Sequence, residues 1–273
     1  MDDPTRPHRE LTKRFVSSGR EWLEEVTRGF HTTRLSHGVF PVSFHGVLAS
    51  DFDAILFDAG GIFLLPDPTV LGPLLAYHGG DPAEAAHRRA HYAGMAAKSA
   101  AGATEKLWED YNLAYVRSVG VFDHEVELAA DVLGRSRNAY TWRWPIPESL
   151  NALQGLHAAG MPMGVVSNAS GQIAEVLARS GVCQVGDGAA TPMRVIIDSH
   201  LVGVAKPDPR IFDFALEHFE GVDRSRIAYV GDSVTMDIGG ARAAGLHPML
   251  LDPHDDHPDA DFERLHSLEE LLA

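Results

Sequence analysis

The first indication of the fold is the segment at residues 52–61, which reads Phe52-Asp53-Ala54-Ile55-Leu56-Phe57-Asp58-Ala59-Gly60-Gly61. Its apolar run stops at an acidic residue, which is followed by Ala59 and two glycines. A short apolar run of this kind is typical of a strand buried on both faces of a parallel sheet. An acid between a buried strand and two glycines gains nothing from packing. Asp58 is therefore the first candidate active-site residue.

Similar apolar runs follow at 163–166, 227–230 and 246–251, and the first two stop at Ser167-Asn168 and Gly231-Asp232. Stretches with helical spacing of apolar residues separate these runs, at 147–159, 172–180, 210–219 and 237–244. Strands that alternate with helices of this length predict an α/β fold with a doubly wound parallel sheet. In such sheets the ligand lies beyond the carboxyl ends of the strands. We therefore expect Asp58, Ser167 and Asp232 to converge in one crevice.

Residues 68–144 interrupt this alternation, because they contain almost no strand-like runs and are rich in alanine. They predict a helical insertion, which divides an α/β core made of residues 51–67 and 145–273. Prolines bound the insertion at both ends, so Pro66, Pro68 and the Trp144-Pro145 region are the expected hinges of a lid that opens for substrate.

Residues 1–50 are polar and basic in places, and they are expected to form an N-terminal extension. Trp22, Leu23, Val26 and Phe30 lie near helical spacing and predict one helix packed on the core, or else a segment that binds a partner.

The composition narrows the classes of partner. The chain has 273 residues, 23 Lys and Arg against 38 Asp and Glu, and a net charge of −15. Such an acidic surface repels nucleic acids and anionic membranes, so neither is an expected partner. The single cysteine, Cys183, excludes a disulfide within the chain. With no apolar stretch of signal-peptide or membrane-spanning length, the expected location is cytoplasmic. The oligomeric state is left open.

Four motifs occur in an order that resembles the haloacid dehalogenase superfamily of hydrolases, most of which are phosphatases. They are Phe57-Asp58-Ala59-Gly60-Gly61, Val166-Ser167-Asn168, Ala205-Lys206-Pro207-Asp208-Pro209, and Gly231-Asp232-Ser233 with a further acid at Asp237. Each motif alone is weak evidence for this resemblance, but four motifs in the order typical of the superfamily are strong evidence for it. The resemblance covers about residues 52–273. It implies a Rossmann-like core, with the helical insertion as the cap found in the superfamily's first subgroup.

Phosphoryl transfer needs a nucleophile and charge neutralisation, which these residues can supply. Asp58 is the expected nucleophile, forming an aspartyl-phosphate. Lys206 would give a fixed positive charge to Asp58 and to the phosphoryl oxygens. Ser167, with backbone N–H groups nearby, can donate to a phosphoryl oxygen. Ser167, Asn168 and Lys206 are thus the expected substrate-binding residues for a small phosphorylated substrate.

A carboxylate that faces a phosphate dianion repels it, so a cation must lie between the two. Mg²⁺ prefers hard oxygen ligands and keeps several waters, so it needs few protein ligands. Asp58 and Asp232 are the expected carboxylate ligands of Mg²⁺, and Gly60 can offer its backbone carbonyl. Asp237 is either a ligand or a residue that holds the ligands in place.

The chain departs from the superfamily pattern at Gly60, where phosphatases usually carry an Asp that acts as general acid and base, and at Ile62, where Thr is usual. General acid–base help contributes about 10²–10⁴ in rate. The departure leaves open a 2-haloacid dehalogenase, a phosphonate hydrolase with Lys98 as its Schiff-base lysine, and a binding module with a weakened site. Gly231-Asp232 argues for Mg²⁺ and against a dehalogenase.

Three residues of the helical insertion complete the candidate set. Lys98 is expected to be a solvated surface residue, because buried lysines are rare. His87 and His91 are four residues apart and share one face of a helix, which is expected to be polar. If the missing acid at position 60 does not limit turnover, His91 is the candidate proton donor to the leaving group.

Overall fold

The structure is a computed structural model that describes residues 49–102 and 107–272. The predicted N-terminal extension, including its patch at Trp22, Leu23, Val26 and Phe30, lies outside these residues except for positions 49 and 50. None of the helices in the part of the chain that is described has the length and apolar character needed to cross a membrane.

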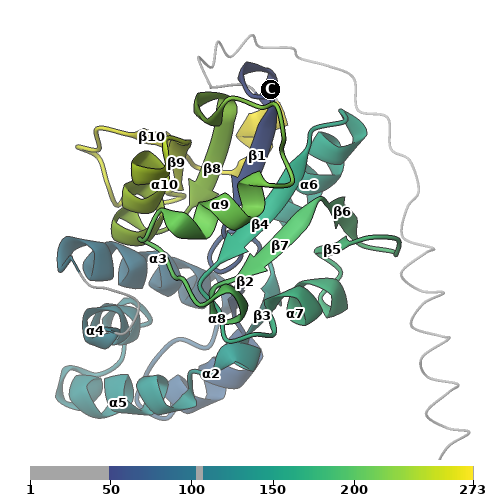
Figure 1. The fold of residues 1–273 in the computed structure, drawn as a ribbon. Helices are drawn as coiled ribbons and strands as arrows, with labels where there is room; N and C mark the ends of the chain where they lie inside the picture. Colours follow the sequence, from purple (N-terminus) through teal and green to yellow (C-terminus); the bar gives the residue numbers. More distant parts are fainter. Residues whose placement is uncertain (1–48, 103–106, 273) are drawn as a thin grey trace, which may run out of the picture. The chain divides into compact units, whose positions relative to one another are not determined.

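Ten strands and nine helices, with short helical turns between them, make up the described chain (Figure 1). The strands are β1 (Ala54–Phe57), β2 (Leu64–Pro66), β3 (Trp142–Pro145), β4 (Met163–Ser167), β5 (Cys183–Val185), β6 (Thr191–Met193), β7 (Val195–Asp198), β8 (Ile227–Gly231), β9 (His247–Leu251) and β10 (Glu263–Leu265). The helices are α2 (Pro68–Ala76), α3 (Glu84–Ala100), α4 (Glu109–Ser118), α5 (Val126–Ser136), α6 (Pro147–Ala158), α7 (Ile173–Arg179), α8 (Ser199–Val202), α9 (Arg210–Leu216) and α10 (Gly239–Ala244). The helical turns are η1 (Ala49–Asp51), η2 (Asp123–Glu125), η3 (Ala139–Thr141), η4 (Arg224–Arg226), η5 (Val234–Ile238) and η6 (Leu268–Leu272).

The main sheet has six strands in the order β10-β9-β8-β1-β4-β7, and every neighbouring pair is parallel. The first strand, β1, therefore lies between β4 and β8, so the residues that follow these three strands must be neighbours. This confirms the predicted α/β fold with a parallel sheet. The strands β7 and β10 were not predicted. β10 is short and polar, whereas Val195-Ile196-Ile197-Asp198 repeats the apolar run with a terminal acid that marks β1.

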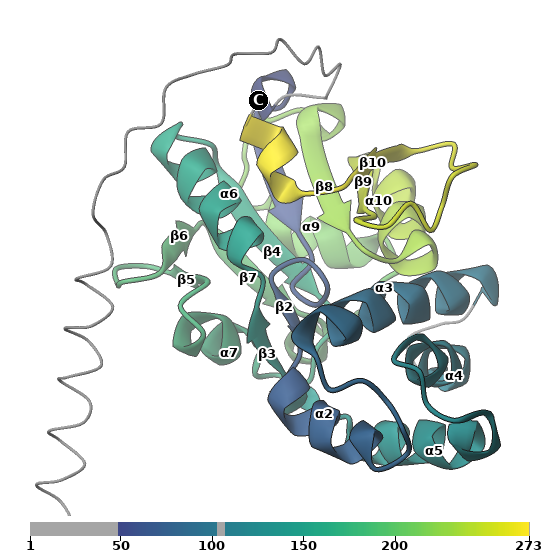
Figure 2. The same cartoon turned by 180° about the vertical axis from the view of Figure 1, so that it is seen from behind.

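Helices cover both faces of the sheet, because successive side chains of a strand point to opposite faces. Ile55 and Phe57 of β1 pack in the apolar cluster under α6, whereas Ala54 and Leu56 pack in the cluster that contains residues of α9 and α10. Figures 1 and 2 show α9 and α10 on one face and α6 on the opposite face. All four residues of β1 are fully buried, which accounts for its uninterrupted apolar sequence.

The helices α2 to α5 all lie between β2 and β3, and the described residues 67–141 add no strand to the main sheet. The strands β2 and β3 pair with each other in antiparallel fashion, so the two chain segments that enter and leave the helical insertion lie side by side. Asp67 ties them together, since its side chain caps α2 through Thr69 N and accepts from Arg143 Nε of β3 at 2.7 Å. The apolar residues of α2 to α5 form one buried cluster, which Met236 of η5 joins, and α3 lies across the carboxyl edge of the sheet (Figure 2).

Candidate active site

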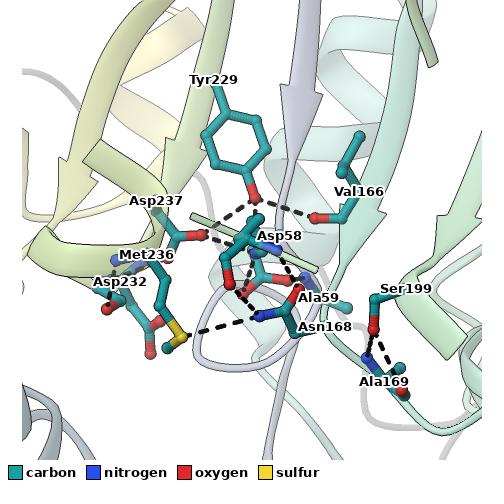
Figure 3. A network of polar contacts seen from close by, with 12 residues as sticks. Asp58, Ala59, Val166, Asn168, Ala169, Ser199, Tyr229, Asp232, Met236 and Asp237 are labelled. Atoms are coloured by element: carbon teal, nitrogen blue, oxygen red, sulfur yellow. Dashed lines mark hydrogen bonds and ion pairs between the residues drawn. The ribbon is translucent and has the colours of Figure 1, made fainter. Parts of the chain in front are cut away.

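Residues at the carboxyl ends of three adjacent strands meet in one polar network (Figure 3). Asp58 follows β1, Ser167 ends β4, and Asp232 follows β8. Carboxylate oxygens of Asp58, Asp232 and Asp237 lie within 4.8 Å of one another. The structure thus brings together the strand-end residues that the sequence placed in one crevice.

Lys206 lies between two of these carboxylates. Its Nζ is 3.0 Å from Asp58 Oδ2 and 2.7 Å from Asp237 Oδ1, and its side chain is 1% exposed. Asn168 fixes the backbone of Lys206, because Asn168 Oδ1 accepts from Lys206 N at 2.8 Å and Nδ2 donates to Lys206 O at 3.0 Å. The Asn168 amide is therefore engaged in positioning the lysine.

Both oxygens of Asp237 are held by donors of the protein. Oδ1 accepts from Lys206 Nζ, and Oδ2 accepts from the backbone N–H groups of Asp232 (3.1 Å) and Ser233 (2.9 Å). The Tyr229 hydroxyl accepts from Lys206 Nζ at 2.8 Å and lies 3.1 Å from Asp237 Oδ1. Of the two roles that the sequence left open for Asp237, this geometry favours the one that holds Lys206 and the 232–233 backbone in place.

Negative charge exceeds positive charge in this cluster, which contains three carboxylates and one lysine. Burial raises the pKa of Asp58 to about 7, although the charge of Lys206 opposes the rise. Burial also raises the pKa of Asp232. Burial alone would lower the pKa of the Lys206 ammonium, but the nearby charges of Asp237 and Asp58 outweigh this effect and raise it. A divalent cation would restore neutrality, and a set of carboxylate oxygens is the donor set that a hard cation prefers. The residues present therefore fit Mg²⁺.

Asp198 is a site residue that the sequence analysis missed. It is buried at the end of β7, and its Oδ2 accepts from the backbone N–H groups of Gly171 (2.9 Å) and Ile173 (3.3 Å). These bonds hold the loop that follows Ser167 and Asn168. The pattern of an apolar run that ends in an acid, which singled out Asp58, also occurs here and could have found Asp198.

A cavity of about 230 Å³ opens onto the cluster. Asp58, Ser167, Lys206 and Asp232 line it from the core, and Trp108 and Trp142 line it from the helical insertion and from β3. Arg137 and Asn138 also line it, so charged, polar and aromatic side chains share the wall of the cavity.

Trp142 lies against the position where the superfamily pattern would place an acid. A Cβ built at Gly60 would lie 3.1 Å and 3.2 Å from two carbons of the Trp142 indole. Gly60 does not adopt a positive φ, whereas Gly61 has a φ of +70°. An Asp at position 60 thus meets a neighbouring ring and no backbone strain.

Two expectations for the helical insertion were wrong. Lys98 is not solvated: it is 1% exposed, and its Nζ lies 3.3 Å from the centroid of the Trp108 ring. His87 and His91 do not form a polar surface, since they are 3% and 0% exposed. The cause is the same for all three residues, because α3 turns this face toward α4 and the core, where aromatic rings and Asp232 surround it.

His91 bonds to the cluster itself. Its Nε2 lies 2.9 Å from Asp232 Oδ2, and its Nδ1 lies 3.0 Å from the Tyr111 hydroxyl. Both ring nitrogens are thus engaged, and His91 does not line the cavity. This geometry does not favour His91 as the proton donor to a leaving group in that cavity.

Comparisons with known proteins agree with this arrangement. A family model described as haloacid dehalogenase-like hydrolase matches residues 52–245. Pyrimidine 5'-nucleotidase YjjG of Escherichia coli (strain K12) is 30% identical over 183 residues, which cover 61% of this chain and 78% of that protein. Phosphoserine phosphatase of Thermus thermophilus is 29% identical over 210 residues, which cover 70% of this chain and 81% of that protein.

A crystal structure of a dehalogenase with an intermediate complex shares the fold. It has a TM-score of 0.50 at 20% identity and covers 81% of this chain and 96% of its own. The family model matches well over half of the chain. Its matched region contains all four motifs, so the family is recognised by the same residues that form the site. The chain belongs to the haloacid dehalogenase-like hydrolases.

Proposed function

We propose that this hydrolase is an Mg²⁺-dependent phosphatase that acts on a small phosphorylated substrate through an aspartyl-phosphate on Asp58. The observation that carries the proposal is the group of three carboxylates, two of them paired with Lys206, beside the cavity that Asp58, Lys206 and Asp232 line. Asp58 and Asp232, with the Gly60 carbonyl, would hold Mg²⁺, which when bound neutralises the charge that otherwise repels a phosphate dianion. The similarity to a nucleotidase and a phosphatase supports a phosphate ester as the substrate class.

The reaction takes place in two displacements at phosphorus. An Asp58 oxygen forms a bond to the phosphorus, the bond from phosphorus to the leaving oxygen breaks, and that oxygen takes up a proton. Water then attacks the phosphorus and gives up one proton, which replaces the proton that the leaving oxygen took up; the bond to Asp58 breaks, and inorganic phosphate leaves with the free carboxylate restored. Lys206 keeps Asp58 in place and offsets negative charge on the phosphoryl oxygens, while the Ser167 hydroxyl donates to one of them.

The first test is a substrate panel assayed with Mg²⁺ and with EDTA. We expect release of inorganic phosphate from p-nitrophenyl phosphate and from small phosphate esters in Mg²⁺, with loss of activity in EDTA and recovery when Mg²⁺ is added back, because the cluster lacks the positive charge to bind a dianion alone. Full activity in EDTA would contradict the proposal.

Three other outcomes would select other functions once a 2-haloacid, an aldehyde substrate, acyl phosphates and phosphonates are added to the panel. Halide release from a 2-haloacid without metal would select a dehalogenase. Borohydride trapping of Lys98 with an aldehyde substrate would select a phosphonate hydrolase, although Lys98 does not line the cavity. No turnover of any ester, acyl phosphate or phosphonate in Mg²⁺ would select a binding module.

A second prediction concerns leaving groups. If protonation of the leaving group limits turnover, Gly60→Asp should raise activity on alkyl phosphates by up to about 10²-fold and change p-nitrophenyl phosphate little, since assistance grows with leaving-group pKa. Steady-state kinetics on both substrates measure this. Gly60→Ala is the control, because it places the same Cβ against Trp142 and adds no acid. An equal change on both substrates in a folded Gly60→Asp variant would show that the missing acid does not limit this site.

A further inference from the structure

The helix α3 is fastened to the core at several points along its length. The contacts are Arg88 to Glu148 at 3.0 Å, Arg89 to Asp256 at 2.7 Å, the Tyr92 hydroxyl donating to Gly61 O at 2.8 Å, and Val234 N donating to Ser99 Oγ at 3.2 Å. These contacts fix the register of α3 against the carboxyl edge of the sheet. They also place His91, between them, directly over Asp232.

Hydrogen bonds join the three side chains in series. An ionised carboxylate only accepts, so the bond between His91 and an ionised Asp232 requires a proton on His91 Nε2. The other ring nitrogen, Nδ1, lies 3.0 Å from the Tyr111 hydroxyl. Tyr111, His91 and Asp232 thus form one hydrogen-bonded chain, and all three side chains are at most 5% exposed.

The chain leaves space for this contact at Gly61. A Cβ at that position would lie 1.9 Å from Asp232 Oδ2 and 2.7 Å from His91 Nε2, and the φ of +70° is one that residues with side chains rarely adopt. Any other residue at position 61 would therefore separate the imidazole from the carboxylate.

Asp232 has two oxygens with different surroundings. Oδ2 is held by His91, whereas Oδ1 accepts no hydrogen bond from any residue in 49–102 or 107–272, and Asp232 lines the cavity. Outer partners of this kind set the orientation of metal-binding side chains.

We propose that His91, itself oriented by Tyr111, is a positioning residue that holds Asp232 Oδ2 and so presents the other oxygen to the divalent cation. The inference rests on the proposed function, in which Asp58 and Asp232 hold that cation. It follows that cation binding depends on the position of α3 against the core, since the residue that orients Asp232 belongs to the helical insertion and not to the core.

The molecule contains a matched internal control. His87 and Tyr115 repeat the pair of His91 and Tyr111 one turn away on both helices, with His87 Nδ1 at 2.8 Å from the Tyr115 hydroxyl. Both histidines are buried, but His87 Nε2 has no hydrogen-bond partner among the residues described and touches no carboxylate of the cluster. The two pairs thus differ in the contact with Asp232.

The experiment is calorimetric titration of the full chain with Mg²⁺ alone, in the absence of substrate, with thermal unfolding to check the fold. His91→Asn is too short to reach Asp232, and we expect it to raise the Kd for Mg²⁺ by about 10- to 100-fold. His91→Gln places an amide N–H where Nε2 lies and should recover most of the affinity. Tyr111→Phe should weaken binding by a smaller factor, and His87→Asn and Tyr115→Phe should leave it unchanged.

Each outcome decides one claim. If wild-type protein binds no Mg²⁺, the proposed function fails and the inference falls with it. If wild-type protein binds Mg²⁺ and a folded His91→Asn variant binds it equally well, or if His87→Asn weakens binding as much, the positioning role is wrong while the proposed function stands. If His91→Asn does not fold, His91→Gln and Tyr111→Phe test the positioning role instead. Unchanged Mg²⁺ affinity in Tyr111→Phe, together with weak Mg²⁺ binding in His91→Gln, would overturn the inference.

Discussion

Asp58→Asn is expected to abolish turnover and to leave the protein folded. The amide cannot form an aspartyl-phosphate, and loss of a nucleophile lowers kcat by on the order of 10⁴–10⁶ in enzymes whose catalytic groups act as a unit. Stability should not fall, because the substitution removes one of three carboxylates that repel one another, and Lys206 keeps its ion pair with Asp237. Phosphate release and urea unfolding measure the two effects.

Asp53→Asn is the matched control for this variant. Asp53 lies one residue before β1 and makes an exposed ion pair with Arg226, away from the cluster. It should retain turnover, since an exposed pair of this kind contributes little. Turnover like that of the wild type in Asp58→Asn would exclude Asp58 as the nucleophile.

Lys206→Met is expected to destabilise the folded protein strongly. The substitution leaves three clustered carboxylates without their cation, and breaking a buried ion pair from one side typically costs about 3–5 kcal/mol. Mg²⁺ should restore part of the loss, because it supplies positive charge to the same carboxylates and binds only the folded state. Urea unfolding with and without Mg²⁺ measures both the loss and the recovery.

Lys98→Met serves as its control, since Lys98 is also a buried lysine but lies over the Trp108 ring and not among the carboxylates. Its unfolding should respond to Mg²⁺ as the wild type does. A Lys206→Met variant as stable as the wild type would show that Lys206 does not balance the charge of the cluster.

The core of the fold could be predicted because its strands are buried on both faces. Apolar runs predict β1, β4 and β8; they lie before Asp58 and at 163–166 and 227–230. Because these strands are parallel neighbours, their carboxyl ends bring Asp58, Ser167 and Asp232 together. The short strands carried no such signal. β10 is mostly polar, and β2 and β3 form only because they pair with each other at the two ends of the helical insertion.

The environment of the helical insertion could not be predicted from the sequence. A face with His87, His91 and Lys98 suggests contact with water, yet α3 packs this face against the aromatic residues of α4 and against Asp232, which is 141 positions away from His91. Contacts between residues so distant along the chain follow from tertiary packing, and helical periodicity carries no information about them. The role of Asn168 is hidden for the same reason, because its side-chain amide binds the backbone of Lys206, which lies 38 positions further along the chain.

Peptide mapping of protein quenched in acid during turnover tests whether Asp58 carries the phosphoryl group. With Mg²⁺ and a substrate that the panel identifies, we expect a phosphoryl group on the peptide that contains Asp58. The group should be absent in EDTA and in Asp58→Asn. Phosphate release at the full rate with no phosphoryl group on Asp58, or with the group on another residue, would show that Asp58 is not the nucleophile.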